Sequence, residues 1–338
     1  MAGESLPVGM RPDDRTNDVL ENGFIDDGII QIDVKEASCC MYDDAIWRDI
    51  ELQRSGACPV CRTNAGPVAL REGEYSGRQC ACGVIYIDPL PDHLADATVD
   101  HHHRVYYSAP ARARVGWVKA FTRRGRLLEI GCGDGEFTAA AIRAGFTVEA
   151  VEPSDERATR VERTLGITVE RALIEDSRLP EGRYDTTFHV DLLSHFPDPV
   201  AALGAIAAKV APGGTVCFEV GLFSNLSPFW QRLVGRPNMP THMWFFDAPA
   251  IERLLDAAGL KLIAMRRYPV GLSTALSTVL GSRRVAAAPD SHAPLAQGWA
   301  AAPYYRLHMF LRYGIGRWLP MGGPQTAFVA ARHKTDSA

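Results

Sequence analysis

The stretch LLEIGCGDGEF, residues 127–137, constrains the fold of this chain more than any other. A short apolar run leads into Gly131, Gly133 and Gly135, and the residues that follow favour a helix. A strand, a glycine turn and a helix in this order open the nucleotide-binding half of an α/β sheet. The dinucleotide fingerprint G-x-G-x-x-G needs a third glycine at position 136, where this chain has glutamate. The turn therefore predicts a nucleotide site of another kind.

The charge of the turn indicates which ligand it binds. Glu129, Asp134 and Glu136 surround it, and a pyrophosphate at a helix N-terminus needs a site free of competing negative charge. S-adenosylmethionine (SAM) fits better, because it carries a sulfonium and an ammonium and no phosphate. Glu152, 21 residues after Gly131, stands where an acidic side chain can accept from both ribose hydroxyls. The alternative is a glycine turn with scattered surface acids, or a sheet that binds another nucleotide.

Strands and helices alternate from residue 127 onward. The pattern predicts strands at 127–130, 147–151, 167–170, 184–190, 215–220, 261–268 and 325–332. Helices between them begin at Ser154, Asp198 and Asp247, all residue types that cap helices. This alternation is typical of an α/β, doubly wound Rossmann-like sheet with ligands at the carboxyl ends of its strands. The connection 270–323 is too long for a plain loop, so we expect a helical insertion or lid there.

Composition is that of an ordinary soluble protein. The 338 residues carry a net charge of −4, no apolar run reaches the ~18 residues of a spanning helix, and we find no secretory signal. We therefore expect a cytoplasmic enzyme. The mild acidity argues against a nucleic-acid partner, which needs clustered Lys and Arg. We predict four regions: an N-terminal extension (1–57), a zinc-ribbon-like module (58–92), a linker helix region (93–125) and a SAM-binding domain (126–338).

Two close cysteine pairs are separated by 18 residues, Cys58-Pro-Val-Cys61 and Cys80-Ala-Cys82. In a chain without an export signal, cysteines point to thiol or metal chemistry, and this spacing resembles a zinc ribbon. The second pair is C-x-C where a ribbon has C-x-x-C, which leaves less room to turn both thiolates onto one ion. We expect a structural zinc ion. A ribbon that folds without metal is the alternative, and the neighbouring Cys39-Cys40 could replace a ligand.

Over roughly 127–335 the chain resembles class I SAM-dependent methyltransferases. The resemblance rests on LLEIGCGDGEF, VEAVEPS, YDTTFHVDLLSHFPDP, VAPGGTVCFEV and THMWFFDAPAIERLLDAAGL. It is greatest with the small-molecule branch that includes quinol O-methyltransferases, in which LEHVPDP is typical where this chain has LLSHFPDP. The stretch CACGVIYIDPLPD is similar to the CxxCGLVFxDPRP that introduces many enzymes of this branch.

The resemblance implies roles for single residues. Those expected to hold the cofactor are Glu129, Gly131, Gly133 and Gly135 for the methionine moiety, Glu152 for the ribose, the Leu173 backbone or Glu175 for the adenine, and Asp191 for the reactive side. The family often has an Asp after the third strand for the adenine amine, and RALIEDS has none at that place. Quinol enzymes can also place a metal with acid-x-x-Glu-His, but here the run Asp191-x-x-Ser194-His195 lacks one ligand.

Transfer of a methyl group to a hydroxyl needs a base for the hydroxyl proton. His195, after the fourth strand, is the first candidate, and His242 in THMWFF is the second. Each could instead be a packed or loop histidine. Residues His101–His103 read as a solvated linker, and Tyr106-Tyr107 as a cofactor entrance or core packing. The aromatic residues of the insertion read as a lid over the acceptor, as a membrane-binding surface, or as a packing or homodimer contact.

We therefore expect a SAM-dependent methyltransferase that acts on a small molecule, and we favour an oxygen of a phenolic or natural-product-like acceptor. C- or N-methylation of a sugar, isoprenoid or other metabolite is the first alternative. An RNA or protein methyltransferase, or a SAM-binding module without catalysis, is the second.

Overall fold

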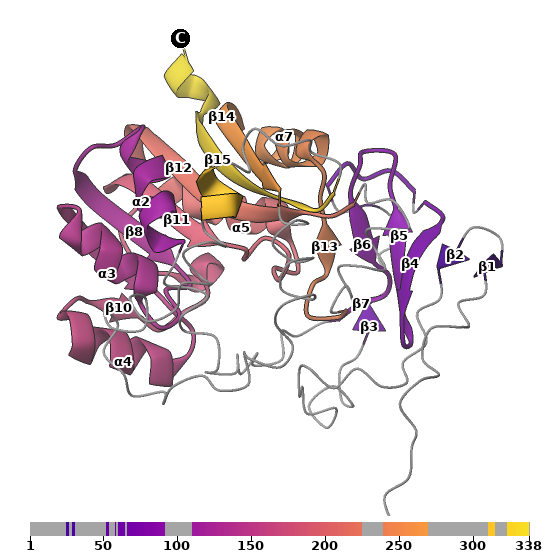
Figure 1. Ribbon diagram of the computed structural model, residues 1–338, viewed down its shortest axis with the longest axis horizontal. Coiled ribbons are helices and arrows are strands. Elements are labelled where there is room, and N and C mark those ends of the chain that lie inside the picture. The colour runs from indigo at the N-terminus through magenta and orange to yellow at the C-terminus, as the bar shows by residue number, and fades with distance from the viewer. Residues whose placement is uncertain are drawn as a thin grey trace, which may run out of the picture.

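The structure is a computed structural model of the full chain (Figure 1). It describes residues 25–26, 29–30, 52–53, 58, 60–64, 66–91, 110–224, 239–269, 310–314 and 323–337. Several features singled out from the sequence lie outside these ranges, namely Cys39-Cys40, His101–His103, Tyr106-Tyr107 and most of the insertion 270–323.

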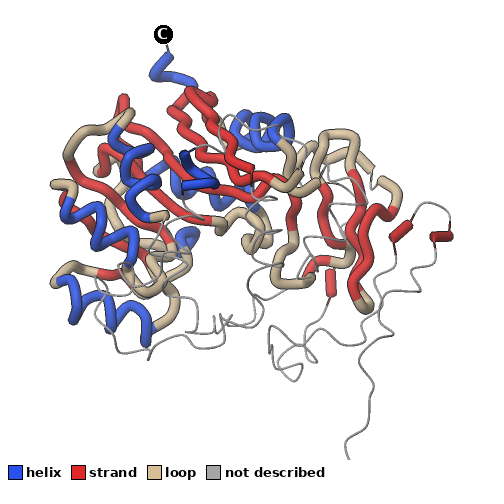
Figure 2. Tube along the Cα trace, viewed as in Figure 1, coloured by secondary structure: helices blue, strands red, loops and turns tan. Residues whose placement is uncertain are grey.

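The main sheet has seven strands in the order β10-β9-β8-β11-β12-β15-β14 (Figures 1 and 2). Its strands are β8 (Gly125–Ile130), β9 (Phe146–Val151), β10 (Val169–Glu170), β11 (Tyr184–Val190), β12 (Val210–Leu222), β14 (Leu260–Pro269) and β15 (Gln325–His333). From β10 to β12 the neighbours run parallel, and β15 is antiparallel to both of its neighbours. The predicted doubly wound, Rossmann-like α/β sheet is confirmed.

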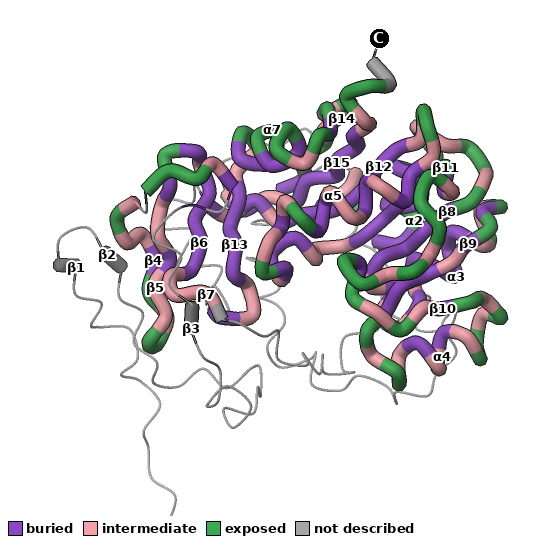
Figure 3. The backbone as a smooth tube through the Cα atoms, turned by 180° about the vertical axis from the view of Figure 1, so that it is seen from behind, coloured by how far each residue is buried: buried purple, intermediate pink, exposed green. Residues whose placement is uncertain are grey.

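Helices cover both faces of this sheet, and its strands are largely buried (Figure 3). The helices are α2 (Ala111–Lys119), α3 (Glu136–Arg143), α4 (Asp155–Leu165), α5 (Pro199–Lys209) and α7 (Ala248–Ala257). On one face α2 and α3 pack against Leu127 and Phe188. On the other, α5 and α7 pack against Leu128 and Phe218. Successive side chains of a strand point to opposite faces of the sheet, so Leu127 and Leu128 belong to two different cores.

The helix caps expected from the sequence are present. The side chains of Ser154, Asp198 and Asp247 each accept a hydrogen bond from a backbone N–H in the first turn of α4, α5 and α7. These bonds satisfy N–H groups that have no partner within the helix. Strand β12 is longer than expected: it begins at Val210 and not at residue 215, because Val210 already pairs with Tyr184 of β11.

A second sheet, which we call the ribbon sheet, has the order β13-β6-β5-β4 (Figure 1). Strands β4 (Val68–Glu72), β5 (Tyr75–Gln79) and β6 (Ile85–Ile87) are antiparallel neighbours from the cysteine region. The fourth strand, β13 (Trp244–Phe245), follows the main sheet's β12 in the chain and pairs antiparallel with β6. One hydrophobic core contains both Cys58 and Trp244. The ribbon region is therefore packed onto the main domain, and the boundaries predicted for it stay a prediction.

Short elements complete the described part. Strand β1 (Ile25–Asp26) pairs with β2 (Ile29–Ile30), and β3 (Leu52–Gln53) pairs with β7 (Leu90–Pro91). Single helical turns are η2 (Ile174–Asp176), η3 (Phe310–Gly314) and η5 (Lys334–Ser337). The turn η3 lies between β14 and β15 in the stretch predicted as an insertion, and the helical insertion or lid stays a prediction. Every helix in the described ranges is too short or too polar to cross a bilayer.

Candidate cofactor and catalytic site

The glycine turn follows β8 and leads into α3. Gly131, Gly133 and Gly135 have φ angles of 66°, 53° and 84°, a region that residues with a Cβ atom rarely adopt. A Cβ at position 131 would lie 2.8 Å from the Leu192 side chain, whereas no described atom lies within 4 Å of a Cβ added at position 133. The turn is thus packed tightly at Gly131 and open at Gly133, where a ligand can approach the backbone.

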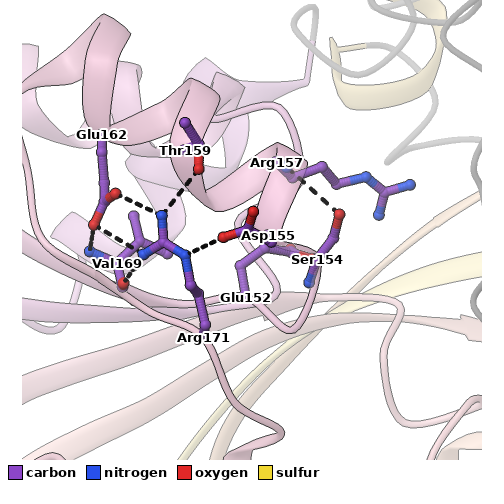
Figure 4. A network of polar contacts seen from close by, with 8 residues as sticks. All are labelled: Glu152, Ser154, Asp155, Arg157, Thr159, Glu162, Val169 and Arg171. Carbon is purple, nitrogen blue, oxygen red and sulfur yellow. Dashed lines mark hydrogen bonds and ion pairs between the residues drawn. The ribbon is translucent and has the colours of Figure 1, made fainter.

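Glu152 joins this turn to the next strand. It directly follows β9, and its buried carboxylate accepts from the N–H of Gly133 at 2.9 Å and from the N–H of Ser154 at 3.1 Å. Figure 4 shows Glu152 and Ser154 side by side at the start of α4. A buried carboxylate is stabilised by such donors. It lies at the carboxyl ends of the parallel strands, where a ribose contact is predicted.

Glu129 lies on β8 beneath the turn. Its buried side chain accepts a hydrogen bond from the Thr138 hydroxyl of α3. Burial raises the pKa of Glu129 to about 8, and the neighbouring Glu136 and Glu152 carboxylates add to this shift. The side chain is therefore mostly protonated at neutral pH, and a bound cation nearby would favour its ionised form.

The negative charge around the turn is smaller than the sequence suggests. Asp134 forms an ion pair with Arg160 of α4, and Glu129 is largely neutral. Of the three carboxylates that favour a cation over a pyrophosphate, one is thus paired and one ionises fully only above neutral pH. The preference for a cationic ligand depends in part on the ligand itself, since its charge lowers the cost of ionising Glu129.

Arg171 connects α4 to the loop that carries Leu173 (Figure 4). Its guanidinium donates to Asp155 at 2.6 Å, to Thr159 at 3.0 Å and to Glu162 at 2.9 Å. Leu173 follows β10 at the same edge of the sheet, with 41% of its surface exposed. The network fixes the loop against α4, and the adenine contact at Leu173 stays a prediction.

Asp191 directly follows β11 and has a left-handed backbone, with φ of 52°. Its N–H donates to the Glu219 carbonyl at 2.8 Å, and its carboxylate accepts from the N–H of Gly221 at 3.4 Å. These bonds continue the pairing of β11 with β12 beyond the end of β11. A strained residue held this firmly at the ligand edge of a sheet is typical of a functional site. The side chain's position is consistent with the predicted reactive side of the cofactor.

The two candidate histidines lie against each other, with ring centroids 4.6 Å apart. Nδ1 of His195 lies 2.7 Å from the carbonyl oxygen of Thr241. A carbonyl only accepts, so Nδ1 carries the hydrogen and Nε2 of the neutral ring is the nitrogen that can take up a proton. The sequence analysis predicted the two histidines separately. It had no signal for their contact, because His195 and His242 stand 47 positions apart in the chain.

The sequence analysis missed Glu219 as a site residue. This buried carboxylate on β12 pairs with Arg114 of α2 and Arg312 of η3, and the Tyr313 hydroxyl lies 3.4 Å from it. Both arginines are also buried. The described turn of the insertion is therefore anchored to the sheet directly beside Asp191. A lone Glu within the apolar run TVCFEV was the available signal, since a buried acid needs partners.

The four predicted metal ligands come together. The sulfur atoms of Cys58, Cys61, Cys80 and Cys82 all lie within 4.8 Å of one another. The shortest separations are 3.3 Å between Cys61 and Cys80 and 3.7 Å between Cys58 and Cys82. Tetrahedral zinc with Zn–S bonds of ~2.3 Å needs sulfurs just under ~4 Å apart, so the four residues fit such an ion. The C-x-C spacing is no obstacle: residues 80–83 form a turn in which the Gly83 N–H donates to the Cys80 carbonyl at 3.0 Å, and both thiols lie in the cluster.

The thiols of this cluster differ in acidity. Burial raises the pKa of Cys58 to about 11. For Cys61 burial acts in the same direction, but hydrogen bonds with Thr63 and Cys80 outweigh it and lower the pKa to about 6. Zinc binds thiolates, so an ion at this site would release the protons of the buried thiols.

Comparison with known proteins identifies the family. Residues 100–265 match the family model described as a methyltransferase domain. A ubiquinone biosynthesis O-methyltransferase of Burkholderia vietnamiensis is 31% identical over 183 residues, which cover 48% of this chain and 78% of that protein. The protein of the same name from Bordetella avium is 33% identical over 190 residues, or 51% of this chain and 78% of that protein. The chain belongs to the methyltransferase family.

The methyltransferase is an enzyme that uses SAM as its cofactor, as the turn and the resemblance predicted. It covers some relatives less completely: the Burkholderia ambifaria protein of the same name is 32% identical over 130 residues, only 56% of its length. Among solved structures, the geranyl diphosphate C-methyltransferase of Streptomyces coelicolor has 14% identity and a TM-score of 0.45, over 70% of this chain and 82% of that one.

Replacing Glu152 with alanine should weaken SAM binding about 10- to 100-fold, because a hydrogen bond to a charged group contributes ~1.5–3 kcal/mol. Isothermal titration calorimetry on the full chain measures the affinity. Glu181→Ala, which removes an exposed carboxylate before β11, is the matched control and should bind SAM like the wild type. A folded Glu152→Ala protein with unchanged affinity would refute the ribose contact.

The affinity for SAM should rise between pH 6 and pH 7.5, by at most about tenfold per pH unit. The free protein holds a proton on Glu129, whose pKa is about 8, and the cationic ligand favours the ionised form, so binding releases that proton. Calorimetry in two buffers of different ionisation enthalpy counts the released protons. Glu129→Gln should remove the dependence, and a wild-type affinity that is flat over this range would contradict the contact.

Proposed function

We propose that this methyltransferase transfers the methyl group of SAM to a hydroxyl oxygen of a small phenolic or natural-product-like acceptor. The observation that carries the proposal is the His195 ring, whose Nδ1 is fixed by the Thr241 carbonyl at 2.7 Å and whose Nε2 is left to accept a proton. The ring belongs to the segment after β11, next to Asp191. The relatives named ubiquinone biosynthesis O-methyltransferases support an oxygen acceptor.

Each residue has a distinct task in this proposal. When bound, SAM supplies a methyl group made electrophilic by its sulfonium sulfur, which departs as a neutral thioether. Glu129, Glu152 and the open backbone at Gly133 hold and orient the donor at the carboxyl edge of the sheet. His195 Nε2 takes the proton of the acceptor hydroxyl while its oxygen forms the new C–O bond. Alignment of this kind can contribute ~7–11 kcal/mol, and a positioned base a further 10²- to 10⁴-fold.

We also propose that Cys58, Cys61, Cys80 and Cys82 hold one structural zinc ion. The sulfur separations, the burial of three of the four residues and the low pKa of Cys61 support this. Four thiolate ligands leave no open position for a substrate, so the ion would stabilise the ribbon and take no part in methyl transfer.

Replacing His195 with alanine should lower the turnover number with hydroxyl acceptors about 10²- to 10⁴-fold. SAM affinity should stay unchanged. Transfer of labelled methyl from SAM into a panel of catechols and quinols measures turnover, and NMR of the product distinguishes O–CH₃ from C–CH₃. His333→Ala, a histidine at the end of β15, is the control. Unaffected turnover in His195→Ala would show that His195 is not the base. A C-methyl product would show that the acceptor atom is carbon and not oxygen.

Purified methyltransferase should contain about one zinc per chain, because four clustered thiolates bind the ion tightly. Cys82→Ser should lower both the zinc content, measured by mass spectrometry of the metal, and the melting temperature. Cys217→Ala changes a buried thiol in β12 away from the cluster and should retain the zinc. A wild-type zinc ratio near zero would end the proposal.

A further inference from the structure

The ribbon sheet is bound to the segment that carries His242. Strand β13 pairs with β6 through Trp244 opposite Tyr86 and Phe245 opposite Ile85. The N–H of Ile87 adds a bond to the Met243 carbonyl at 3.0 Å. Figure 1 shows β13 beside β6, at the place where the ribbon sheet meets the main domain. We call residues 239–246, which surround β13, the bridging segment.

Two side-chain contacts extend this attachment beyond the strand pair. The Glu72 carboxylate, at the end of β4, accepts from the N–H of Met239 at 2.7 Å. The Ser224 hydroxyl, just after β12, donates to the carbonyl of Gly83 in the C-x-C turn at 2.8 Å. The ribbon sheet thus contacts the first residue of the bridging segment and its middle. It also contacts Ser224, just after β12.

The opposite side of the bridging segment contacts the loop after β11. Three hydrogen bonds make this contact: His195 Nδ1–H to the Thr241 carbonyl at 2.7 Å, the Met243 N–H to the Ser194 carbonyl at 2.7 Å, and the Trp244 indole N–H to the Phe196 carbonyl at 2.6 Å. Met243 and Trp244 are buried. The bridging segment is therefore hydrogen-bonded to the ribbon sheet on one side and to the loop that carries the proposed base on the other.

We propose that the ribbon sheet positions His195 through the bridging segment, with Glu72 as a positioning residue. This rests on the proposed function, in which His195 Nε2 takes the acceptor proton. The carbonyl that fixes the His195 tautomer belongs to Thr241, only two residues after Met239. A hydrogen bond that a backbone N–H donates to a carboxylate is among the stronger ones, so it restrains the segment two residues before Thr241.

Glu72 is the contact that can be altered without changing the backbone. Glu72→Ala removes the acceptor and releases Met239, whereas Glu72→Gln keeps an oxygen that can accept from the same N–H. Glu74, in the turn directly after β4, is exposed, so Glu74→Ala is the matched control. Both residues belong to the β4–β5 hairpin of the ribbon sheet, whereas Glu129 lies in β8 and Glu152 follows β9 of the main sheet, so SAM affinity should not change in any of the three variants.

The first measurement needs no activity. In the zinc-loaded full chain with ¹⁵N-labelled histidine, long-range ¹H–¹⁵N spectra report which ring nitrogen of His195 is protonated, with His195→Gln used for assignment. Wild type, Glu72→Gln and Glu74→Ala should show the Nδ1–H form, and Glu72→Ala a mixture of tautomers. A folded Glu72→Ala protein that keeps the wild-type tautomer overturns the proposal, whatever its turnover.

The second measurement separates the steps of catalysis. Glu72→Ala should lower kcat about 10- to 100-fold, since a misplacement of about 1 Å can cost that much, with SAM affinity unchanged and activity restored in Glu72→Gln. Equal kcat in Glu72→Ala and Glu74→Ala overturns the proposal. Should Glu72→Ala not fold, Glu72→Asp, which shortens the side chain by one methylene, carries both measurements. If the wild type transfers no methyl group, the proposed function fails, and the tautomer comparison still decides the positioning.

Discussion

The hydrogen bond between the Glu152 carboxylate and the Gly133 N–H is the contact on which the site depends. It links the turn after β8 to the residue after β9, so two parallel strands end in one rigid edge. A charge buried this deeply is tolerated only with donors around it, and the backbone supplies two. The same hydrogen bonds leave the carboxylate at the position where the ribose contact is predicted. In the predicted ribose contact, structural support and ligand recognition would therefore use the same atoms.

The predicted catalytic side of the edge is assembled from three distant parts of the chain. Asp191 and His195 follow β11, the bridging segment follows β12, and Arg312 comes from the insertion. Glu219 draws two arginines to the sheet beside Asp191, and the Thr241 carbonyl selects one tautomer of His195. Of these contacts, the one with Thr241 decides which nitrogen of His195 can take up a proton, the role proposed for this residue.

The sequence was informative where structure is local. The turn LLEIGCGDGEF and the caps at Ser154, Asp198 and Asp247 depend on neighbours a few residues away, and all were predicted. The cysteine spacing predicted a cluster that does form. The division into regions, the roles of the site residues and a homodimer stay predictions.

Contacts between segments that are distant in the chain could not be predicted from the sequence pattern. Strand β13 is two residues long, and nothing in Trp244-Phe245 shows that its partner lies far earlier in the chain. The pairing of Asp134 with Arg160 likewise depends on how α4 lies over the turn. Counting carboxylates in the sequence therefore overestimated the free charge, since partners and burial both change what a carboxylate contributes.

The composition of the ribbon sheet has a consequence for biosynthesis. Strands β4 to β6 leave the ribosome more than 150 residues before β13 does, so the β6 edge of the nascent chain has no β13 partner until then. Exposed edges invite pairing with other chains. Completion of the sheet waits for the synthesis of β13, which follows β12 in the chain, so the cysteine region is made well before its sheet can be finished.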